Sequence, residues 1–236
     1  MPAHNEADLL DESVREVVAG LRTAGRAFEM LVVENGSTDG TAALAERIAV
    51  ALPEVRPRSL PAADYGAALR GGILAARGDI VVIFDVDYYD LAFLVDAVAL
   101  LEHEPSPPAI VVASKRAPGS IDERPLVRRV VTAGFATILR VGFGLRVSDT
   151  HGMKALRRSA VVELVRSCRF GRDLFDTELL LRVERAGVPV AELPVRVAER
   201  RPPRTPIARR AARTVVGLVR LRVALARERG ARPARR

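Results

Sequence analysis

A short apolar run that ends in two aspartates constrains this chain more than any other stretch. Residues 80–84 are all apolar, which predicts a strand buried on both faces of a parallel sheet. Side chains alternate along a strand, so Asp85 and Asp87 are expected to point the same way from its carboxyl end, where open α/β sheets bind ligands. Two carboxylates there suit Mg²⁺ or Mn²⁺, which take their other ligands from water and substrate phosphate. By itself such a pair is more often a solvated cap.

Strand and helix patterns alternate through the first half of the chain. They fall at residues 10–21, 30–33, 42–52, around 55, 64–77 and 80–84. Later patterns predict helices at 91–102, 126–141, around 161–165 and 175–186, and strands at 109–113 and 190–197. Pro194 makes the last of these an edge strand. This order predicts an α/β fold, a mostly parallel sheet flanked by helices and joined by right-handed crossovers.

Charge divides the chain into two parts. Residues 200–236 hold 13 Arg and 1 Glu, so the remaining 24 basic and 28 acidic residues give the body a net charge of −4. We therefore expect a globular domain at residues 1–200 and a basic tail at 201–236 whose partner is an anionic surface. Nucleic acid is not expected, because aromatic residues make up 4% of the chain and no nucleic-acid module is present.

The cysteine content and hydropathy bear on the compartment. One cysteine, Cys168, excludes an internal disulfide and fits a reducing compartment. No apolar run reaches the roughly 18 residues of an unaided membrane span. We expect a cytoplasmic protein that associates peripherally with the inner face of a membrane.

Seven short motifs follow one another along the body. They are P-A-H-N-E at 2–6, V-E-N-G-S-T-D-G-T at 33–41, Y-G-A-A-L-R at 65–70, D-V-D at 85–87, S-K-R at 114–116, S-D-T-H-G-M-K at 148–154 and F-D-T-E-L-L at 175–180. In this order they resemble the family 2 glycosyltransferases of GT-A fold, and within that family the dolichyl or polyprenyl phosphate mannosyl- and glucosyltransferases. The resemblance covers about residues 2–200.

The resemblance implies a nucleotide-sugar site and a divalent metal. The nucleotide sugar is assigned to Pro2, Asn5 and Glu6, to Glu34, Gly36 and Ser37, and to Gly66 and Arg70. Asp85 and Asp87 hold Mg²⁺ or Mn²⁺, which neutralises the leaving nucleoside diphosphate. Many relatives have a second acid where Asn35 stands, which leaves the base open between UDP and GDP sugars. Tyr89 replaces a common glutamine, so Asp90 or water is expected to complete the metal shell.

On the acceptor side, an ionised lipid phosphate needs cationic positioning more than it needs a base. Arg116 and Arg128 are the expected phosphate ligands, with Thr132 one turn beyond Arg128. Ser114, Lys115 and Lys154 are secondary candidates. Asp149 is the expected base if the acceptor is a hydroxyl compound. His151 is interpreted as a loop residue, and Asp176 and Glu178 as helix-start acids.

The tail has the pattern of a basic amphipathic helix. Pro202, Pro203 and Pro206 separate it from the body, and its apolar stripe is Ile207, Ala211, Val215, Leu218, Leu221 and Leu225. Such a helix suits an anionic membrane interface. The alternative is a helix that packs on the body with a solvated basic face.

The family normally begins with a strand just before the Pro2 segment, and here Met1 stands in that place. We expect a truncated first strand, neighbouring strands with unpaired backbone groups, and a true start a few codons upstream. Three functions remain open. The leading one is an inverting, metal-dependent transferase that moves mannose or glucose from a nucleotide sugar to a polyprenyl phosphate. The others are a transferase with a soluble hydroxyl acceptor and a degenerate, non-catalytic nucleotide-sugar-binding domain.

Overall fold

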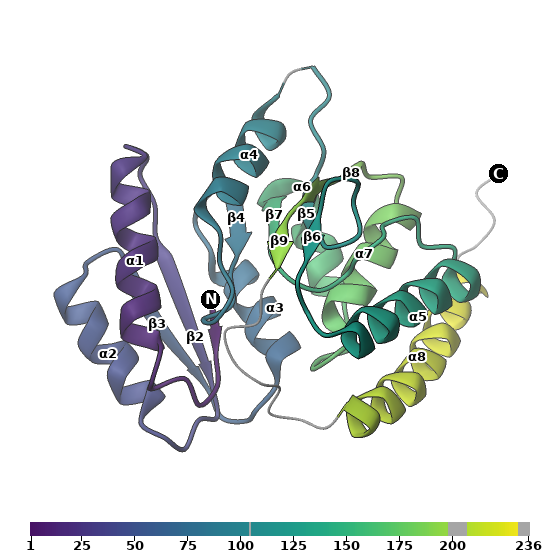
Figure 1. Ribbon diagram of the computed structural model, residues 1–236, viewed down its shortest axis with the longest axis horizontal. Coiled ribbons are helices and arrows are strands. Elements are labelled where there is room, and N and C mark those ends of the chain that lie inside the picture. Colours follow the sequence, from purple (N-terminus) through teal and green to yellow (C-terminus); the bar gives the residue numbers. More distant parts are fainter. Residues whose placement is uncertain (104, 198–206, 231–236) are drawn as a thin grey trace.

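The computed structural model describes residues 1–103, 105–197 and 207–230, and within the last range the side chains of 213–228. Strands β1 (Pro2–Ala3), β2 (Met30–Asn35) and β3 (Val55–Leu60) form a parallel sheet in the order β1-β2-β3. Helices α1 (Leu10–Thr23), α2 (Thr41–Ala51) and α3 (Tyr65–Ala75) connect and cover these strands (Figure 1). These elements are the βαβ units that the sequence predicts.

A second sheet has the order β4-β7-β5-β8, formed by β4 (Ile80–Ile83), β7 (Lys154–Arg157), β5 (Ile110–Ser114) and β8 (Val190–Pro194). β7 runs antiparallel to both neighbours, and β5 and β8 are parallel. The other elements are α4 (Leu91–Glu102), α5 (Leu126–Phe143), α6 (Arg158–Ser167), α7 (Phe175–Arg185), α8 (Ile207–Gly230) and the short pair β6 (Ile121–Asp122) and β9 (Arg196–Val197). The predicted edge position of residues 190–197 is confirmed for β8.

Two apolar cores lie on opposite faces of the second sheet. Alternate residues of β5 divide between them: Val111 and Ala113 belong to one core, and Ile110 and Val112 to the other. The first core is completed mainly by α1, α2 and α4, and the second by α3, α6, α7 and part of α8. This layering confirms the predicted α/β architecture with helices on both sides.

The first strand is truncated, as predicted, because β1 holds only Pro2 and Ala3 and lies within the Pro2 segment rather than before it. It still pairs with β2, so the expectation that this neighbour is left with unpaired backbone groups is wrong. Pro2 and Ala3 pair with Val33 and Glu34, and the Met1 carbonyl accepts a hydrogen bond from the Val33 amide at 2.8 Å. The strand is nevertheless short and does not pair with β4. Consequently the strands form two sheets, and a cavity of about 210 Å³ lies between β2 and β4, lined by Met30, Leu31 and residues 80–84.

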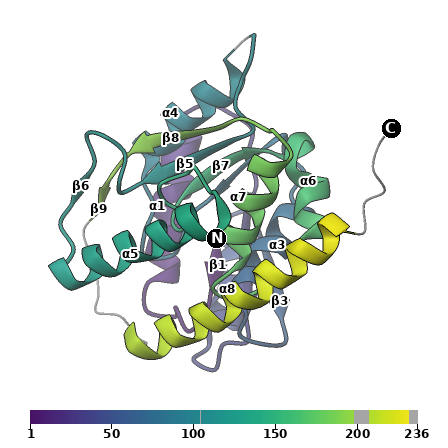
Figure 2. The same ribbon diagram turned by 90° about the vertical axis from the view of Figure 1, so that its right-hand side faces the viewer.

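The tail helix packs on the body, which corrects the expectation that its apolar stripe faces a membrane. Leu218, Leu221 and Leu225 are buried in the second core. Ion pairs fix the helix at both ends: Arg213 lies 2.7 Å from Asp173, and Glu228 lies 2.9 Å from Arg182 of α7. α8 runs beside α5 in both views (Figures 1 and 2).

Part of the predicted tail lies outside the description. The prolines at 202, 203 and 206 and the predicted boundary near residue 200 fall outside the described residues, as do the side chains of Ile207 and Ala211.

Candidate active site

Asp85 and Asp87 lie in a tight turn rather than on the strand. β4 ends at Ile83, and Asp85 and Tyr88 then exchange backbone hydrogen bonds of 3.1 and 3.3 Å. The expectation that strand alternation aligns the two carboxylates is therefore wrong, because the pleat ends before them. The turn still keeps them close enough to repel each other. Burial raises the pKa of Asp85 to about 6, and repulsion from Asp87 adds to the shift.

A tyrosine orients the first of these carboxylates. The Tyr65 hydroxyl, at the start of α3, donates a hydrogen bond of 2.8 Å to Oδ1 of Asp85, which opposes the rise in the pKa of that carboxyl. Sequence reasoning placed Tyr65 in a motif without giving it a role. The contact joins the helix that follows β3 to the aspartate turn.

The donor set fits a hard divalent cation that is completed by substrate. Within the described part of the chain, no group of three or more His, Cys, Asp and Glu side chains is arranged to hold a metal ion. Two close carboxylates are the protein share that Mg²⁺ or Mn²⁺ usually takes when phosphate oxygens and water supply the rest. Asp85 and Asp87 therefore remain the candidate ligands.

The two residues considered as a third ligand have other contacts. The Tyr89 hydroxyl donates to Oε2 of Glu16 on α1 at 2.5 Å. Asp90 caps α4, because its Oδ1 accepts from the amides of Ala92 and Phe93 at 2.8 and 3.2 Å. Of the two expected alternatives, the structure thus favours water over Asp90.

Behind the aspartate turn lies a buried ion pair. Nζ of Lys154, on β7, is 2.9 Å from Oδ1 of Asp176 on α7, and it also donates to the Gly152 carbonyl at 2.9 Å. The two side chains are 1% and 3% exposed. Asp176 and Glu178 lie in the first turn of α7, as predicted, and Asp176 also pairs with Lys154. The expectation of Lys154 as a phosphate ligand gives way to this internal pair. Both charges act on the pKa of Asp85, Lys154 lowering it and Asp176 raising it.

The loops after β1 and β2 form one unit. Asn5 adopts a left-handed backbone conformation with φ of 55°. Its amide donates to Oγ of Ser37 at 3.0 Å, and its side-chain oxygen accepts from the Thr38 amide at 2.9 Å. The buried Glu34 carboxylate accepts a hydrogen bond from the Ser37 amide. The structure thus brings together Asn5, Glu34 and Ser37 at the carboxyl ends of adjacent strands.

Gly36 and Asn35 explain why that unit has this shape. Gly36 has φ of 66°, and a Cβ there would lie 2.7 Å from the Ala63 amide nitrogen. The Asn35 side chain donates to the Ala3 carbonyl at 2.9 Å and accepts from the Asp64 amide at 3.1 Å. The Asn35 amide therefore ties β1 to the start of α3.

Four other residues assigned to the nucleotide have structural contacts. Pro2 lies in β1. A Cβ on Gly66 would approach the backbone of residues 171–172 and the Phe175 side chain within 2.8 Å, so its glycine is explained by helix packing. Arg70 donates to the Arg166 carbonyl of α6 at 3.1 Å. The backbone amide of Glu6 donates to Oγ1 of Thr41 at 2.8 Å. The nucleotide roles of these residues stay predictions.

A cavity of about 640 Å³ lies between α5, α8 and the loop at residues 147–151. Its walls are mainly apolar and carry a cluster of charges at one end. The apolar lining includes Val131, Phe135, Ile138, Leu139, Val147, Val215 and Leu218, and the polar lining includes Lys115, Arg124, Arg128, Thr132, Ser148, Asp149, Thr150, His151, Asp173 and Thr214. Arg128 and Thr132 thus lie on one wall, as expected, together with Asp149, whereas the exposed Arg116, expected beside Arg128, is not among the lining residues.

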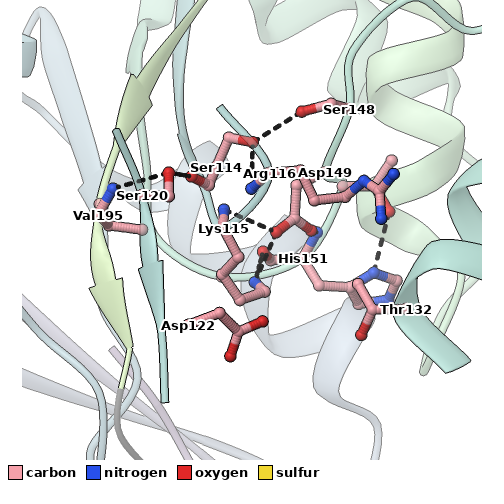
Figure 3. Close-up of polar contacts among 12 residues, drawn as sticks. Ser114, Lys115, Arg116, Ser120, Asp122, Thr132, Ser148, Asp149, His151 and Val195 are labelled. Atoms are coloured by element: carbon pink, nitrogen blue, oxygen red, sulfur yellow. Dashed lines mark hydrogen bonds and ion pairs between the residues drawn. The ribbon is translucent and has the colours of Figure 1, made fainter. Parts of the chain in front are cut away.

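A buried ion pair sets the chemistry of the charged end. Nζ of Lys115 lies 2.7 Å from Oδ2 of Asp149, and both side chains are less than a tenth exposed (Figure 3). Burial is the largest single influence and acts to raise the pKa of Asp149, but the Lys115 charge and the hydrogen bonds from Lys115 and His151 together outweigh it, so the pKa of this carboxyl lies below its ordinary value. The Asp149 carboxylate also accepts from the His151 amide at 3.1 Å. It is thus held as an anion.

Sequence reasoning undervalued several lining residues. It ranked Lys115 second, treated His151 as a loop residue, and gave no role to Arg124 or Phe135. The His151 ring contacts the edge of Phe135 with ring centroids 5.5 Å apart. No local signal identifies these residues, since they meet only when α5 folds over the loop at 147–151.

Comparison with known proteins decides the family. The model of "Glycosyl transferase family 2" matches residues 1–165. The chain belongs to glycosyl transferase family 2. Its α/β architecture is that of GT-A glycosyltransferase structures.

Relatives of this glycosyltransferase differ in length. It is 32% identical to glycosyltransferase AglD of Haloferax volcanii over 203 residues, which are 83% of this chain and 32% of AglD. It is 35% identical to the uncharacterized glycosyltransferase Rv0539 of Mycobacterium tuberculosis, covering 83% of this chain and 82% of that one. Identity to dolichyl-phosphate beta-glucosyltransferase ALG5C of Trichomonas vaginalis is 28%, over 83% of this chain and 61% of the relative. The chain thus spans a third of AglD and less than two thirds of ALG5C.

A solved structure shows the fold with ligands. Glucosyl-3-phosphoglycerate synthase from Mycobacterium tuberculosis, in complex with Mn²⁺, UDP and phosphoglyceric acid, is 26% identical, with a TM-score of 0.60 over 86% of this chain and 69% of the synthase. The same synthase also appears with Mg²⁺ and UDP. These metals are the pair expected from the carboxylates of this chain.

Across the described ranges, every helix is too short or too polar to cross a bilayer.

Proposed function

We propose that this glycosyltransferase moves a hexose, glucose or mannose, from a nucleotide sugar to a polyprenyl phosphate with inversion at the anomeric carbon. The observation that carries the proposal is the cavity beside α5, which joins a cationic end to an apolar passage. A polyprenyl phosphate has the matching structure, a dianionic head on a hydrocarbon chain. The similarity to dolichyl-phosphate glucosyltransferases supports the same acceptor class.

The charged end of the cavity suits a phosphate more than a sugar hydroxyl. Lys115, Arg124 and Arg128 all line it. Lys115 pairs with Asp149 and Arg124 with Asp122, and the lining carboxylate of Asp173 pairs with Arg213. Guanidinium groups bind phosphate through two parallel hydrogen bonds. The Thr132 hydroxyl, on the same wall, adds a neutral donor.

The transfer itself needs little proton chemistry. An oxygen of the lipid phosphate is already ionised and attacks the anomeric carbon, while the bond from that carbon to the nucleoside diphosphate breaks and its electrons leave with the diphosphate. Asp87 and Asp85 would hold Mg²⁺ or Mn²⁺, which when bound supplies charge neutralisation at the leaving diphosphate. The loop unit of Asn5, Glu34 and Ser37 holds the nucleoside. Arg128 aligns the nucleophile, which is the main catalytic contribution left to the acceptor side.

A transfer assay tests the proposal. Radiolabelled UDP-glucose and GDP-mannose are each offered with Mn²⁺ or Mg²⁺ and a short, detergent-soluble polyprenyl phosphate, and label in the organic phase is counted. We expect lipid product from one donor, lost with EDTA and in Asp87→Ala. Arg128→Ala should raise the KM for the lipid phosphate at least tenfold, because a hydrogen bond to a charged group contributes about 1.5–3 kcal/mol.

The neighbour Arg129 provides the control. It is exposed and is not among the residues that line the cavity, so Arg129→Ala should change the KM less than twofold. Equal effects of the two substitutions would contradict the assigned phosphate site. Release of free sugar from either donor without any lipid product would remove the lipid acceptor.

A soluble hydroxyl acceptor is the second candidate, favoured by Asp149 in the cavity wall and by the phosphoglyceric acid bound in the related synthase. A hydroxyl nucleophile needs a base, and Asp149 is the carboxylate in position to serve. Asp149→Asn should then abolish transfer to hydroxyl acceptors, whereas transfer to a lipid phosphate should retain most of its rate.

A further inference from the structure

Exposed apolar side chains concentrate on two helices. Of thirteen large apolar side chains that are exposed among the described residues, six lie on α5 and four on α8. They are Leu126, Val127, Val130, Val131, Ile138 and Val141 of α5, and Val215, Val216, Val219 and Val223 of α8, with exposed fractions of 43% to 82%. We name these ten residues the α5–α8 apolar surface. A concentration of this kind on a soluble domain marks an interaction site.

On α5 these residues form one stripe. Their spacing of one, three, four and seven residues places all six on one side of the helix. The opposite side carries Leu139, the buried residue of this helix. Eighteen residues of helix thus turn their apolar side outward, which has no explanation in the packing of the domain.

On α8 there are two apolar sides. Leu218, Leu221 and Leu225 face the second core. Val216, Val219 and Val223 recur at spacings of three and four on the other side and are 54%, 61% and 45% exposed. Packing on the body therefore uses one side and leaves the second apolar side facing solvent.

The two stripes meet at the cavity. Val131 and Ile138 of α5 and Val215 of α8 are half-exposed and also line the 640 Å³ cavity. Both helices lie along the same side of the molecule, on the right in Figure 1 and facing the viewer in Figure 2. The Arg222 guanidinium of α8 donates to the Gly142 carbonyl at the end of α5, which ties the helices together. The apolar surface therefore borders the cavity, and three of its ten residues are also part of the cavity wall.

Positive charge accompanies this surface. Residues 126–143 contain three Arg and no acid, and residues 213–228 contain four Arg and one Glu, a net charge of +6. Arg129 and Arg140 of α5 and Arg220 of α8 are exposed. Apolar side chains bordered by arginine fit the interface of an anionic bilayer, where lipid tails meet phosphate heads.

We propose that the α5–α8 apolar surface docks on an anionic lipid bilayer, so that the cavity opens directly to the membrane and takes its lipid acceptor from there. The inference deepens the proposed function and rests on it for the identity of that acceptor. The proposed contact uses the valine side of α8 and not the side with Leu218, Leu221 and Leu225, which is buried in the second core. The bilayer contact needs no membrane-spanning segment, because the partly inserted valines and the arginines act together.

Vesicle binding tests the proposal. The full chain is sedimented with vesicles of phosphatidylglycerol and phosphatidylcholine, and Val130→Asp/Val219→Asp is compared with Val50→Asp/Val95→Asp. Val50 and Val95 are 90% and 57% exposed but lie on α2 and α4. We expect the first variant to bind at least tenfold more weakly and the control within twofold of the unmodified chain. Thermal melting should be unchanged in both, since all four positions are exposed.

Activity separates this inference from the proposed function. Neither Val130 nor Val219 is among the cavity-lining residues, so the first variant should keep its rate on a short polyprenyl phosphate in detergent and lose it on a long one in vesicles. Vesicle binding that is absent, or equal in all variants, would overturn the docking surface. So would a dimer that light scattering detects and the first variant abolishes, because the surface would then serve a second copy. Intact vesicle binding without lipid product in either format would instead refute the proposed function alone.

Discussion

The buried pair of Lys154 and Asp176 offers the sharpest test of how the site is supported. Their side chains are 1% and 3% exposed, with Nζ and Oδ1 2.9 Å apart, so each charge depends on the other for compensation. We consider Lys154→Met, which keeps the length of the chain and removes the charge, Asp176→Asn, and the two together. Each single substitution leaves an uncompensated buried charge, whereas the double variant leaves none.

The expected magnitudes follow from burial. At 2.9 Å and an effective dielectric of about 20, the Coulomb attraction between the two charges is about 6 kcal/mol. Most of this attraction offsets the free energy needed to remove both charged groups from water. Removing one partner of such a pair lowers the free energy of unfolding by about 3–5 kcal/mol. The double variant should lose only about 1–2 kcal/mol, mostly because the Gly152 carbonyl loses its donor. The coupling free energy is then about 4 kcal/mol or more.

Urea denaturation of the four proteins measures this coupling. In thermal melts the melting temperature of each single variant should be about 6–20 °C lower, because a loss of 1 kcal/mol lowers the melting temperature of a domain of this size by about 2–4 °C. The exposed pair of Arg166 and Glu163, with side chains 58% and 75% exposed, is the control and should couple by less than about 0.5 kcal/mol. Additive losses for Lys154 and Asp176 would refute the argument, because they would mean that the two charges are solvated separately.

Three further perturbations test other parts of the structure. Leu221→Ala should lower the free energy of unfolding by about 3–5 kcal/mol if α8 belongs to the folded body. Val219→Ala, at an exposed position of the same helix, should lower it by less than about 0.5 kcal/mol, and urea denaturation measures both. Gly36→Ala should abolish binding of the nucleotide sugar in calorimetry and strongly lower the free energy of unfolding, since its Cβ would meet backbone at 2.7 Å. Its control is Gly40→Ala, where the space is open and φ is 89°, and this substitution should lower the free energy of unfolding by only about 1 kcal/mol. Tyr65→Phe removes one hydrogen bond to the aspartate turn; we expect a higher apparent Kd for Mn²⁺ in the presence of nucleotide and a melting temperature within about 5 °C of the unmodified chain. Equal effects in either matched pair, or an unchanged Kd, would contradict these assignments.

Elements with strong periodicity could be predicted from the sequence. Residues 91–102 carry a helical pattern and form α4 with those bounds. β7 could not be predicted, because four residues between a polar loop and a helix show no alternation, and one of them is Lys154. A lysine is placed at the centre of a sheet only when a distant acid compensates it, and the acid on α7 is 22 residues away in sequence.

The meeting of the loops after β1 and β2 could be predicted for a physical reason that the cavity beside α5 lacks. Carboxyl ends of paired parallel strands lie at one edge of a sheet, so the polar residues that follow β1 and β2 meet there. The turn at residues 85–88 changes how the aspartates are aligned but not where they lie. On the acceptor side, α5, α8 and the loop at 147–151 meet through tertiary packing alone.

The tail helix shows why amphipathicity alone could not decide between a membrane and the protein body. Its sequence has apolar residues on two sides, one with Leu218, Leu221 and Leu225 and one with Val216, Val219 and Val223, and the larger leucines bury more area against the core. Ion pairs at the ends of the helix select the same orientation. Packing therefore takes the leucines and leaves the valines beside an outward-facing apolar side of α5, and the surface available to a membrane arises only from this arrangement of two helices.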